Sequence, residues 1–102
     1  MSPTARSLAL LRSRGYLAEV VEKWIPRANI RKDLWGWCDV LAVHDFGFNA
    51  VQCTTYANVS ARVRKIKESD TFARVRPHLY AISVHGWKKN KQGRWECREV
   101  VV

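Results

Sequence analysis

The stretch WCDVLAVHDFGFNAVQCTT, residues 37–55, constrains the fold more than any other part of the chain. It contains two apolar runs of the kind that form strands, and the segment HDFGFN between them contains Gly47. The pattern predicts two antiparallel strands joined by a tight turn. Each strand has a polar residue inside it, Asp39 in the first and Gln52 in the second. A buried carboxylate is costly unless it is paired or binds a metal, so Asp39 needs a physical explanation.

The first part of the chain predicts a helix followed by a strand. The helix is expected to begin with Ser2 as N-cap and Pro3 at the first helical position, and to stop at Gly15. Residues 16–25 are rich in β-branched and aromatic residues, so they predict a strand that ends before the next proline. Residues 26–33 have the composition of a polar loop.

The last part of the chain predicts a helical region followed by a hairpin. A basic amphipathic helix is expected after Asn58 or Ser60, either of which can be its N-cap. We expect the helix to restart at Ser69 and to run to Arg76, before Pro77 ends it. Together with the strands at 34–43 and 50–55, the final strands are expected at 79–87 and 94–102, joined by the basic turn KKNKQG.

These elements predict a single domain over residues 1–102, with the order αβββαββ. No repeat, linker or low-complexity segment interrupts the order. A chain of this kind forms an α/β (α+β) fold, in which helices flank a central mixed sheet.

Three polar side chains can meet on one face of the predicted sheet. Side chains alternate along a strand, so Gln52 and Thr54 share a face. Cross-strand neighbours lie within about 5 Å, and Asp39 therefore joins them if the register allows it. Asp39 also has two simpler roles open to it: a residue on a polar strand face exposed to water, or a carboxylate satisfied by an arginine or a backbone amide. For Asp33 and Asp45, the role of an ordinary turn residue is favoured.

The net charge points to a polyanionic partner. The chain has 18 basic and 9 acidic residues, a net charge of +9 and a pI near 10.0. This is typical of nucleic-acid-binding proteins, although other basic proteins share it. Residues 27–57 are neutral overall and the basic excess follows them, an arrangement that suits a metal ion acting on a phosphate backbone. The residues we expect to contact nucleic acid are Arg31, Lys32, Arg62, Arg64, Lys65, Lys88, Lys89 and Lys91.

Cysteine usage and hydropathy give expectations about the cellular location. Cys38, Cys53 and Cys97 form no C-x-x-C pair, so they are expected to be reduced thiols. The run LALL is too short for a signal peptide, and no stretch reaches the length of a membrane span. We therefore expect a cytoplasmic protein without a membrane partner.

The segments DLWGWCDVLAV and AVQCTT, followed by a basic helix and the strands ISVHGWKK and GRWECREV, resemble the nuclease core of the PD-(D/E)XK superfamily. Within it, the chain is most similar to small phage and bacterial Holliday-junction-resolvase-like and VRR-NUC-like proteins. The resemblance covers nearly the whole chain and implies a restriction-endonuclease-like αβββαββ core.

The resemblance also implies a catalytic site. Asp39 matches the aspartate of that family and Gln52 matches its Glu or Gln, so both are implied ligands of Mg²⁺ or Mn²⁺. Thr54 stands at the position of the family's lysine and cannot supply its charge, so Lys65 on the following helix is the implied substitute, with Arg62 beside it. Glu19 or Glu22 is the implied replacement for an acidic ligand that many members place on the first helix.

The function implied by the resemblance is hydrolysis of DNA phosphodiester bonds. The expected enzyme is a Mg²⁺-dependent endonuclease that acts as a homodimer on DNA, including branched junctions, and is encoded by a phage or prophage in a bacterial host. The first alternative is a catalytically degenerate protein that uses the same basic face to bind DNA or to regulate. A structural RNA-binding protein is the second alternative.

Overall fold

A five-stranded mixed sheet forms the centre of the computed structural model, which describes all residues from 1 to 102. The strand order is β1-β4-β5-β6-β7; only β5 and β6 are parallel, and the other neighbours are antiparallel. The sheet confirms the predicted α/β class. Its strands are β1 (Leu17–Val20), β4 (Val40–His44), β5 (Gly47–Thr55), β6 (Ala81–Lys89) and β7 (Trp95–Val101).

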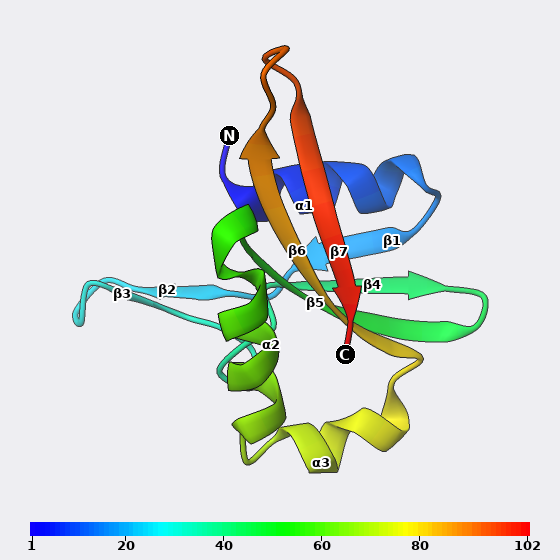
Figure 1. Cartoon of the computed structure of the whole chain (residues 1–102). Coiled ribbons are helices and arrows are strands. Elements are labelled where there is room, and N and C mark those ends of the chain that lie inside the picture. The colour runs from blue at the N-terminus through cyan, green and yellow to red at the C-terminus, as the bar shows by residue number, and fades with distance from the viewer.

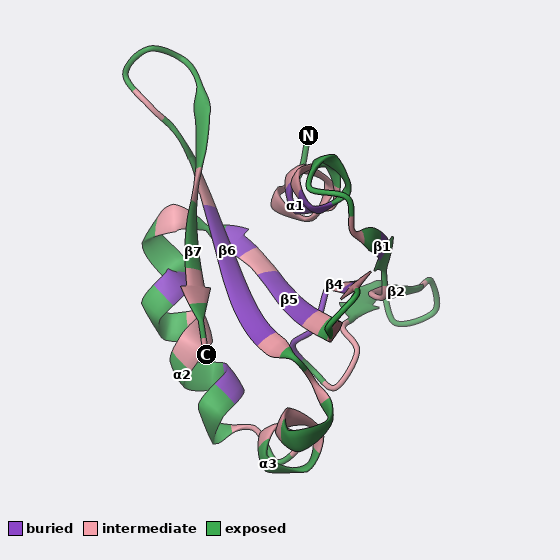
Figure 2. Ribbon diagram, turned by 90° about the vertical axis from the view of Figure 1, so that its right-hand side faces the viewer, coloured by how far each residue is buried: buried purple, intermediate pink, exposed green.

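Helices cover both faces of this sheet. Helix α1 (Pro3–Ser13) packs on one face, and α2 (Val59–Glu68) packs on the other (Figure 1). Figure 2 shows the sheet between the two helices, with the buried (purple) part of β6 lying between them. The chain reaches β6 from α2 through the short α3 (Phe72–Val75), and single 3-10 turns lie at Tyr56–Asn58 and Arg76–His78. None of the helices has the length and apolar character that a membrane crossing requires.

The sheet separates two apolar cores, one under each helix. Burial of such side chains stabilises the fold by about 1.5–3 kcal/mol for each large residue. The core under α1 consists of Leu11, Ala18, Val40, Ala42 and Val51. The core under α2 consists of Trp37, Cys38, Ala50, Val59, Ile66, Ile82 and Val84.

The start of α1 was predicted correctly. The Ser2 hydroxyl accepts a hydrogen bond of 3.1 Å from the backbone N–H of Ala5, which satisfies one of the free amides of the first turn. Pro3 occupies the first helical position, where its missing N–H costs nothing. Gly15 follows the helix with φ of 89°, a left-handed conformation that favours glycine.

The predicted strand over residues 16–25 is divided into two strands that belong to different sheets. The chain leaves the main sheet after β1, and residues Lys23–Ile25 form β2, which pairs with β3 (Ile30–Lys32) in a separate two-stranded sheet. The segment 26–33, predicted as a loop, thus contributes a strand. The reason is that β4 begins only at Val40, so no strand of the main sheet lies beside residues 23–25. The β2–β3 hairpin, residues 23–32, projects from the body of the molecule (Figure 1); we call it the arm.

The predicted strand over residues 34–43 is also wrong in its first half. Residues 34–38 form a closed loop in which Leu34 and Cys38 form an isolated bridge. Trp35 and Gly36 have φ of 59° and 81°, so the backbone turns sharply and cannot extend as a strand. As a result Trp37 and Cys38 pack into the same core and do not alternate between the faces of the sheet.

The remaining boundaries differ in smaller ways. β5 begins at Gly47, so the turn between β4 and β5 is shorter than the predicted segment 44–49. Asn58 is the N-cap position of α2, although its side chain makes no capping bond. The helix predicted to restart at Ser69 is confined to Phe72–Val75, because a turn at Asp70 and Thr71 precedes it. The final hairpin, β6 and β7, is confirmed.

Candidate metal centre

Asp39 lies at the entrance to β4, between β1 and β5. The backbone of Asp39 is bonded on both sides: its carbonyl accepts from Val21 N–H at 2.8 Å, and its N–H donates to the Val51 carbonyl at 2.9 Å. Its carboxylate Oδ2 accepts a hydrogen bond of 2.8 Å from the backbone N–H of Cys53. The side chain is buried, with 4% of its surface exposed. A backbone amide thus satisfies part of this carboxylate, which is one of the simpler roles expected for Asp39.

Glu22 and Asp33 join Asp39 to form a cluster of three carboxylates. The oxygen atoms that they offer all lie within 4.8 Å of one another. Asp39 is buried, and the other two are half-buried. We call this group the carboxylate cluster.

Two closed loops bring the carboxylates together. Lys23 pairs with Lys32 across the arm, so Glu22 and Asp33, which flank these residues, lie side by side at its base. The bridge between Leu34 and Cys38 closes the next loop, so Asp33 and Asp39 flank that loop in turn. All three carboxylates therefore lie at the base of these two loops, where the chain enters and leaves each loop.

The carboxylate cluster holds three acidic groups, and one cation contacts it. The pKa of Asp39 is raised to about 8: burial is the largest cause and the adjoining Asp33 and Glu22 carboxylates add to it, whereas the hydrogen bond from Cys53 N–H acts in the opposite direction. One positive charge lies at the edge of the cluster, because Arg31 Nη1 is 3.1 Å from Glu22 Oε1. A divalent cation bound among the carboxylates would offset both the burial of their charge and their mutual repulsion.

Gln52 places an uncharged oxygen atom, a potential metal ligand, in the same region of the sheet. It directly precedes Cys53, whose N–H bonds Asp39, and only 2% of its surface is exposed. Its side-chain carbonyl Oε1 is buried and has no hydrogen-bond partner. Such an unpaired oxygen costs about 1–3 kcal/mol unless something binds it. Carboxylate and amide oxygens are the ligands that Mg²⁺ takes in proteins, so the residues present fit a Mg²⁺ or Mn²⁺ ion.

No known family model, curated protein or solved structure matches this chain.

Thr54 and Lys65, the two other residues that the resemblance implies, make no hydrogen bond or ion pair with the carboxylates. Thr54 is buried on β5, two positions beyond Gln52, and carries no charge. Lys65 is exposed on α2, and the ion pairs of the chain do not include it. The cation in contact with the carboxylate cluster is Arg31, which was predicted only as a nucleic-acid contact.

The expected nucleic-acid-binding residues occur in three places. The arm carries Arg31 and Lys32, and both are exposed. Lys88 lies over the ring of Tyr56 at 4.2 Å and 3.9 Å from Glu96, so its charge is partly engaged within the molecule. The others are Arg62, Arg64 and Lys65 on α2, and Lys89 and Lys91 at the end of β6 and in the following turn.

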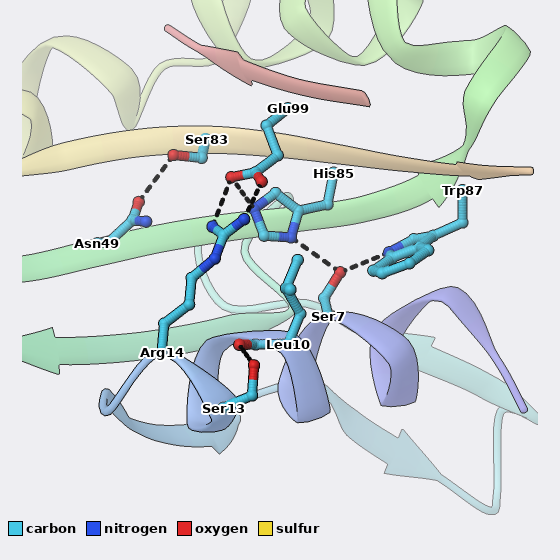
Figure 3. Close-up of polar contacts among 9 residues, drawn as sticks. All are labelled: Ser7, Leu10, Ser13, Arg14, Asn49, Ser83, His85, Trp87 and Glu99. Carbon is cyan, nitrogen blue, oxygen red and sulfur yellow. Dashed lines mark hydrogen bonds and ion pairs between the residues drawn. The ribbon is translucent and has the colours of Figure 1, made fainter. Parts of the chain in front are cut away.

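A second polar group joins α1 to the far strands of the sheet (Figure 3). The Ser7 hydroxyl accepts from Trp87 Nε1 at 2.9 Å and lies 3.0 Å from His85 Nδ1. His85 Nε2 lies 3.4 Å from the Glu99 carboxylate, which also receives both guanidinium nitrogens of Arg14. Burial lowers the pKa of His85 although Glu99 opposes this.

The order serine, histidine, glutamate in this group is that of a hydrolase triad, an arrangement that the sequence does not reveal because residues 7 and 85 are distant in the chain. Ser7 and His85 are both buried, with 0% and 1% of their surfaces exposed. No substrate reaches a nucleophile that is fully covered in this way, so the group holds α1 against the sheet. His85 therefore has a structural role.

Proposed function

We propose that this protein is a divalent-metal-dependent endodeoxyribonuclease of the PD-(D/E)XK type. The observation that carries the proposal is the carboxylate cluster, in which the oxygen atoms of Glu22, Asp33 and Asp39 lie within 4.8 Å of one another. Structural ion pairs also gather carboxylates, but those carboxylates are balanced by cations. Here three carboxylates meet one guanidinium, that of Arg31. The excess negative charge favours a divalent cation.

The residues that would hold the ion are Glu22, Asp33 and Asp39, with Gln52 as a neutral ligand. When bound, Mg²⁺ or Mn²⁺ would polarise a phosphate oxygen and make an attacking water more acidic. The chain itself contributes the remaining work. Cys53 N–H fixes the Asp39 carboxylate, and Arg31 holds Glu22 in place. Because Arg31 is the cation closest to the carboxylates, we assign to it the positioning role that a lysine has in the resembling family.

The arrangement of the sheet supports the same proposal. Asp39 stands at the start of the second strand of the main sheet, and Gln52 lies within the third. These are the positions that the resemblance assigns to the metal ligands. The basic helix α2 then leads to β6, which is parallel to β5.

The substrate side of the proposal rests on charge and size. A net charge of +9 favours a phosphate polyanion, and DNA is the substrate that the resemblance implies. A domain of 102 residues has little surface for gripping two duplex arms, so the proposal includes a homodimer acting on branched DNA. A phage or prophage origin and a bacterial cytoplasm belong to the same proposal.

One observation favours a second function, DNA binding without cleavage. Thr54 occupies the position of the family's lysine, and it is buried and uncharged. If Arg31 does not replace that lysine, the carboxylate cluster is the remnant of an active site. The same basic residues would then serve a DNA-binding or regulatory protein.

Cleavage of a supercoiled plasmid and of a four-way DNA junction with Mg²⁺ or Mn²⁺ tests the proposal. We expect cleavage by the wild-type protein and none by the Asp39→Asn variant. Asp45→Asn is the matched control, because Asp45 lies exposed in the β4–β5 turn and should leave cleavage unchanged. Cleavage that persists in Asp39→Asn would remove the carboxylate cluster from the mechanism. Tight, salt-sensitive binding without cleavage would support the second function.

A further inference from the structure

The arm is a two-stranded sheet that stands apart from both cores. Its strands pair only with each other, and its apolar residues Trp24, Ile25 and Ile30 belong to neither core cluster. Trp24 and Ile30 expose 50% and 52% of their surfaces. An isolated two-stranded hairpin is marginally stable in water, so a partner that covers the arm would stabilise it.

The charges of the arm identify the chemistry of that partner. Residues 23–32 contain four basic side chains and no acidic one. Lys23 and Lys32 are direct cross-strand partners, and like charges placed opposite each other repel. Contact with a polyanion removes this repulsion. The four basic residues are Lys23, Arg27, Arg31 and Lys32, and all are exposed.

The place of the arm links that partner to the carboxylate cluster. Glu22 directly precedes β2 and Asp33 directly follows β3, so the arm rises from the carboxylates themselves. A polyanion bound along the arm therefore passes the cluster at its base.

The dimensions of the arm suit the major groove of B-form DNA. From its base to its tip the arm spans five residues, or roughly 16 Å at about 3.3 Å per residue. The major groove is about 12 Å wide and about 8.5 Å deep, and it admits a two-stranded ribbon. The groove of an A-form RNA duplex is too deep and narrow for the same contact.

We propose that the arm inserts into the major groove of duplex DNA and thereby holds the adjoining phosphate backbone against the carboxylate cluster. This inference deepens the proposed function and rests on its premise that the partner is DNA. Arg27 at the tip enters the groove, and Lys23 and Lys32 near the base contact phosphates on its edges. The substrate is then duplex DNA next to the point of cleavage, whatever branch lies beyond.

A shortened arm provides the main test. Because Lys23 and Lys32 face each other, replacing residues 24–31 by Asn-Gly joins them through a two-residue hairpin turn and leaves Glu22 and Asp33 at its base. Binding to a fluorescent DNA duplex of about 20 bp is measured by anisotropy in EDTA over a salt series. We expect at least about a tenfold loss of affinity and a lower salt slope, because the cations Arg27 and Arg31 are removed.

Two further variants keep the result interpretable. Arg27→Glu changes only an exposed tip residue, so it tests the arm even if the shortened variant fails to fold, and it should weaken binding about as strongly. Lys89→Ala with Lys91→Ala removes two charges from the other basic hairpin. We expect this control to lower the salt slope without changing the contacts to guanine N7, which methylation interference detects in the major groove.

The outcomes distinguish failure of the proposed groove contact from failure of the proposed nuclease activity. Unchanged affinity and salt slope in both arm variants would overturn the groove contact, as would wild-type binding that ignores N7 methylation or that is equally arm-dependent on duplex RNA. Arm-independent binding with Asp39-dependent cleavage would reject the arm alone. Arm-dependent binding without any cleavage would support the arm and reject the proposed nuclease.

Discussion

The Asp39 carboxylate accepts a hydrogen bond of 2.8 Å from the backbone N–H of Cys53, a residue 14 positions further along the chain. This bond holds the carboxylate against β5. The backbone of Asp39 is held as well, since it bonds Val21, directly after β1, and Val51 in β5. The protonation of Asp39 should therefore report on the whole cluster.

The first prediction concerns stability and pH. The pKa of Asp39 is about 8 in the fold, against 3.8 as its ordinary value, so the folded state holds a proton that the unfolded state releases. The stability from this proton is complete below pH 3.8 and is lost as the pH rises through about 8. Asp39→Asn keeps an acceptor for Cys53 N–H without the titration. Denaturant unfolding at several pH values measures the free energy of unfolding of both proteins. Between about pH 5 and about pH 9, that of the variant should rise relative to that of the wild type by on the order of a few kcal/mol. Parallel curves would contradict the raised pKa.

The second prediction concerns metal binding. A cation must displace the proton on Asp39, so Mn²⁺ affinity should rise with pH up to about 8, by up to about tenfold per unit. Calorimetry near neutral pH in buffers of different ionisation enthalpy should show about one proton released for each ion. Asp39→Asn should bind more weakly and release none. Proton-neutral binding by the wild type would place the ion elsewhere.

The third prediction concerns Gln52, whose amide oxygen contributes no charge. Gln52→Glu should strengthen Mn²⁺ binding and, without metal, should destabilise the protein, since a fourth carboxylate joins a buried site. Gln52→Leu retains the volume and removes the unpaired oxygen, so it should weaken metal binding with little loss of stability. Equal Mn²⁺ affinity in all three proteins would exclude Gln52 as a ligand.

Local patterns were sufficient to predict the order of the main elements, but not the carboxylate cluster. Ser2, Pro3 and Gly15 bound α1 by rules that act within a few residues. The composition of residues 16–25 favours a strand throughout, and nothing local indicates that the sheet partner ends at Val40. The end of β1 at Val20 depends on its pairing with β4, a tertiary contact.

Asp33 shows the same limit for the site. It was interpreted as a turn residue, which is the commoner role of an aspartate beside a loop. Pro26 and Asn29 lie midway between Glu22 and Asp33, and this turn signal, interpreted as a hairpin, would have brought the two carboxylates together. The signal was present in the sequence, but only the register of β2 and β3 turns it into a site.

The fourth prediction concerns acid pH and the group in Figure 3. Burial lowers the pKa of His85, because it disfavours the charged imidazolium. The contribution of neutral His85 to the stability of the fold is therefore complete above pH 6.5 and is lost as the pH falls. The pKa of Glu99 is lowered by its bonds to Arg14, so its contribution is present above pH 4.5 and is lost below. In thermal melts of the wild type, the melting temperature should fall as the pH is lowered. His85→Gln should reduce this fall just below pH 6.5, and Glu99→Gln should reduce it below pH 4.5. One common window for both variants would contradict separate titrations.

The fifth prediction concerns the approach of the 3-10 turn and α2 to β6. A Cβ added at Gly86 would lie 2.1 Å from Val59 Cγ2 and 3.0 Å from the Cα of Tyr56, so Gly86→Ala forces the helix away from the sheet. We expect a loss of about 1–3 kcal/mol or more in the free energy of unfolding.

A double-mutant cycle separates this clash from backbone strain. Val59→Ala removes the closest atom, so with Gly86→Ala the combined loss should be smaller than the sum of the single losses, although the contact with Tyr56 persists. Gly93→Ala is the matched control: Gly93 has φ of 79° and no atom closer than 3.8 Å to the added Cβ, so its cost is conformational. That cost should add to the cost of Val59→Ala. Equal coupling in both cycles, measured by denaturant unfolding, would mean that α2 is not held against β6 at Gly86.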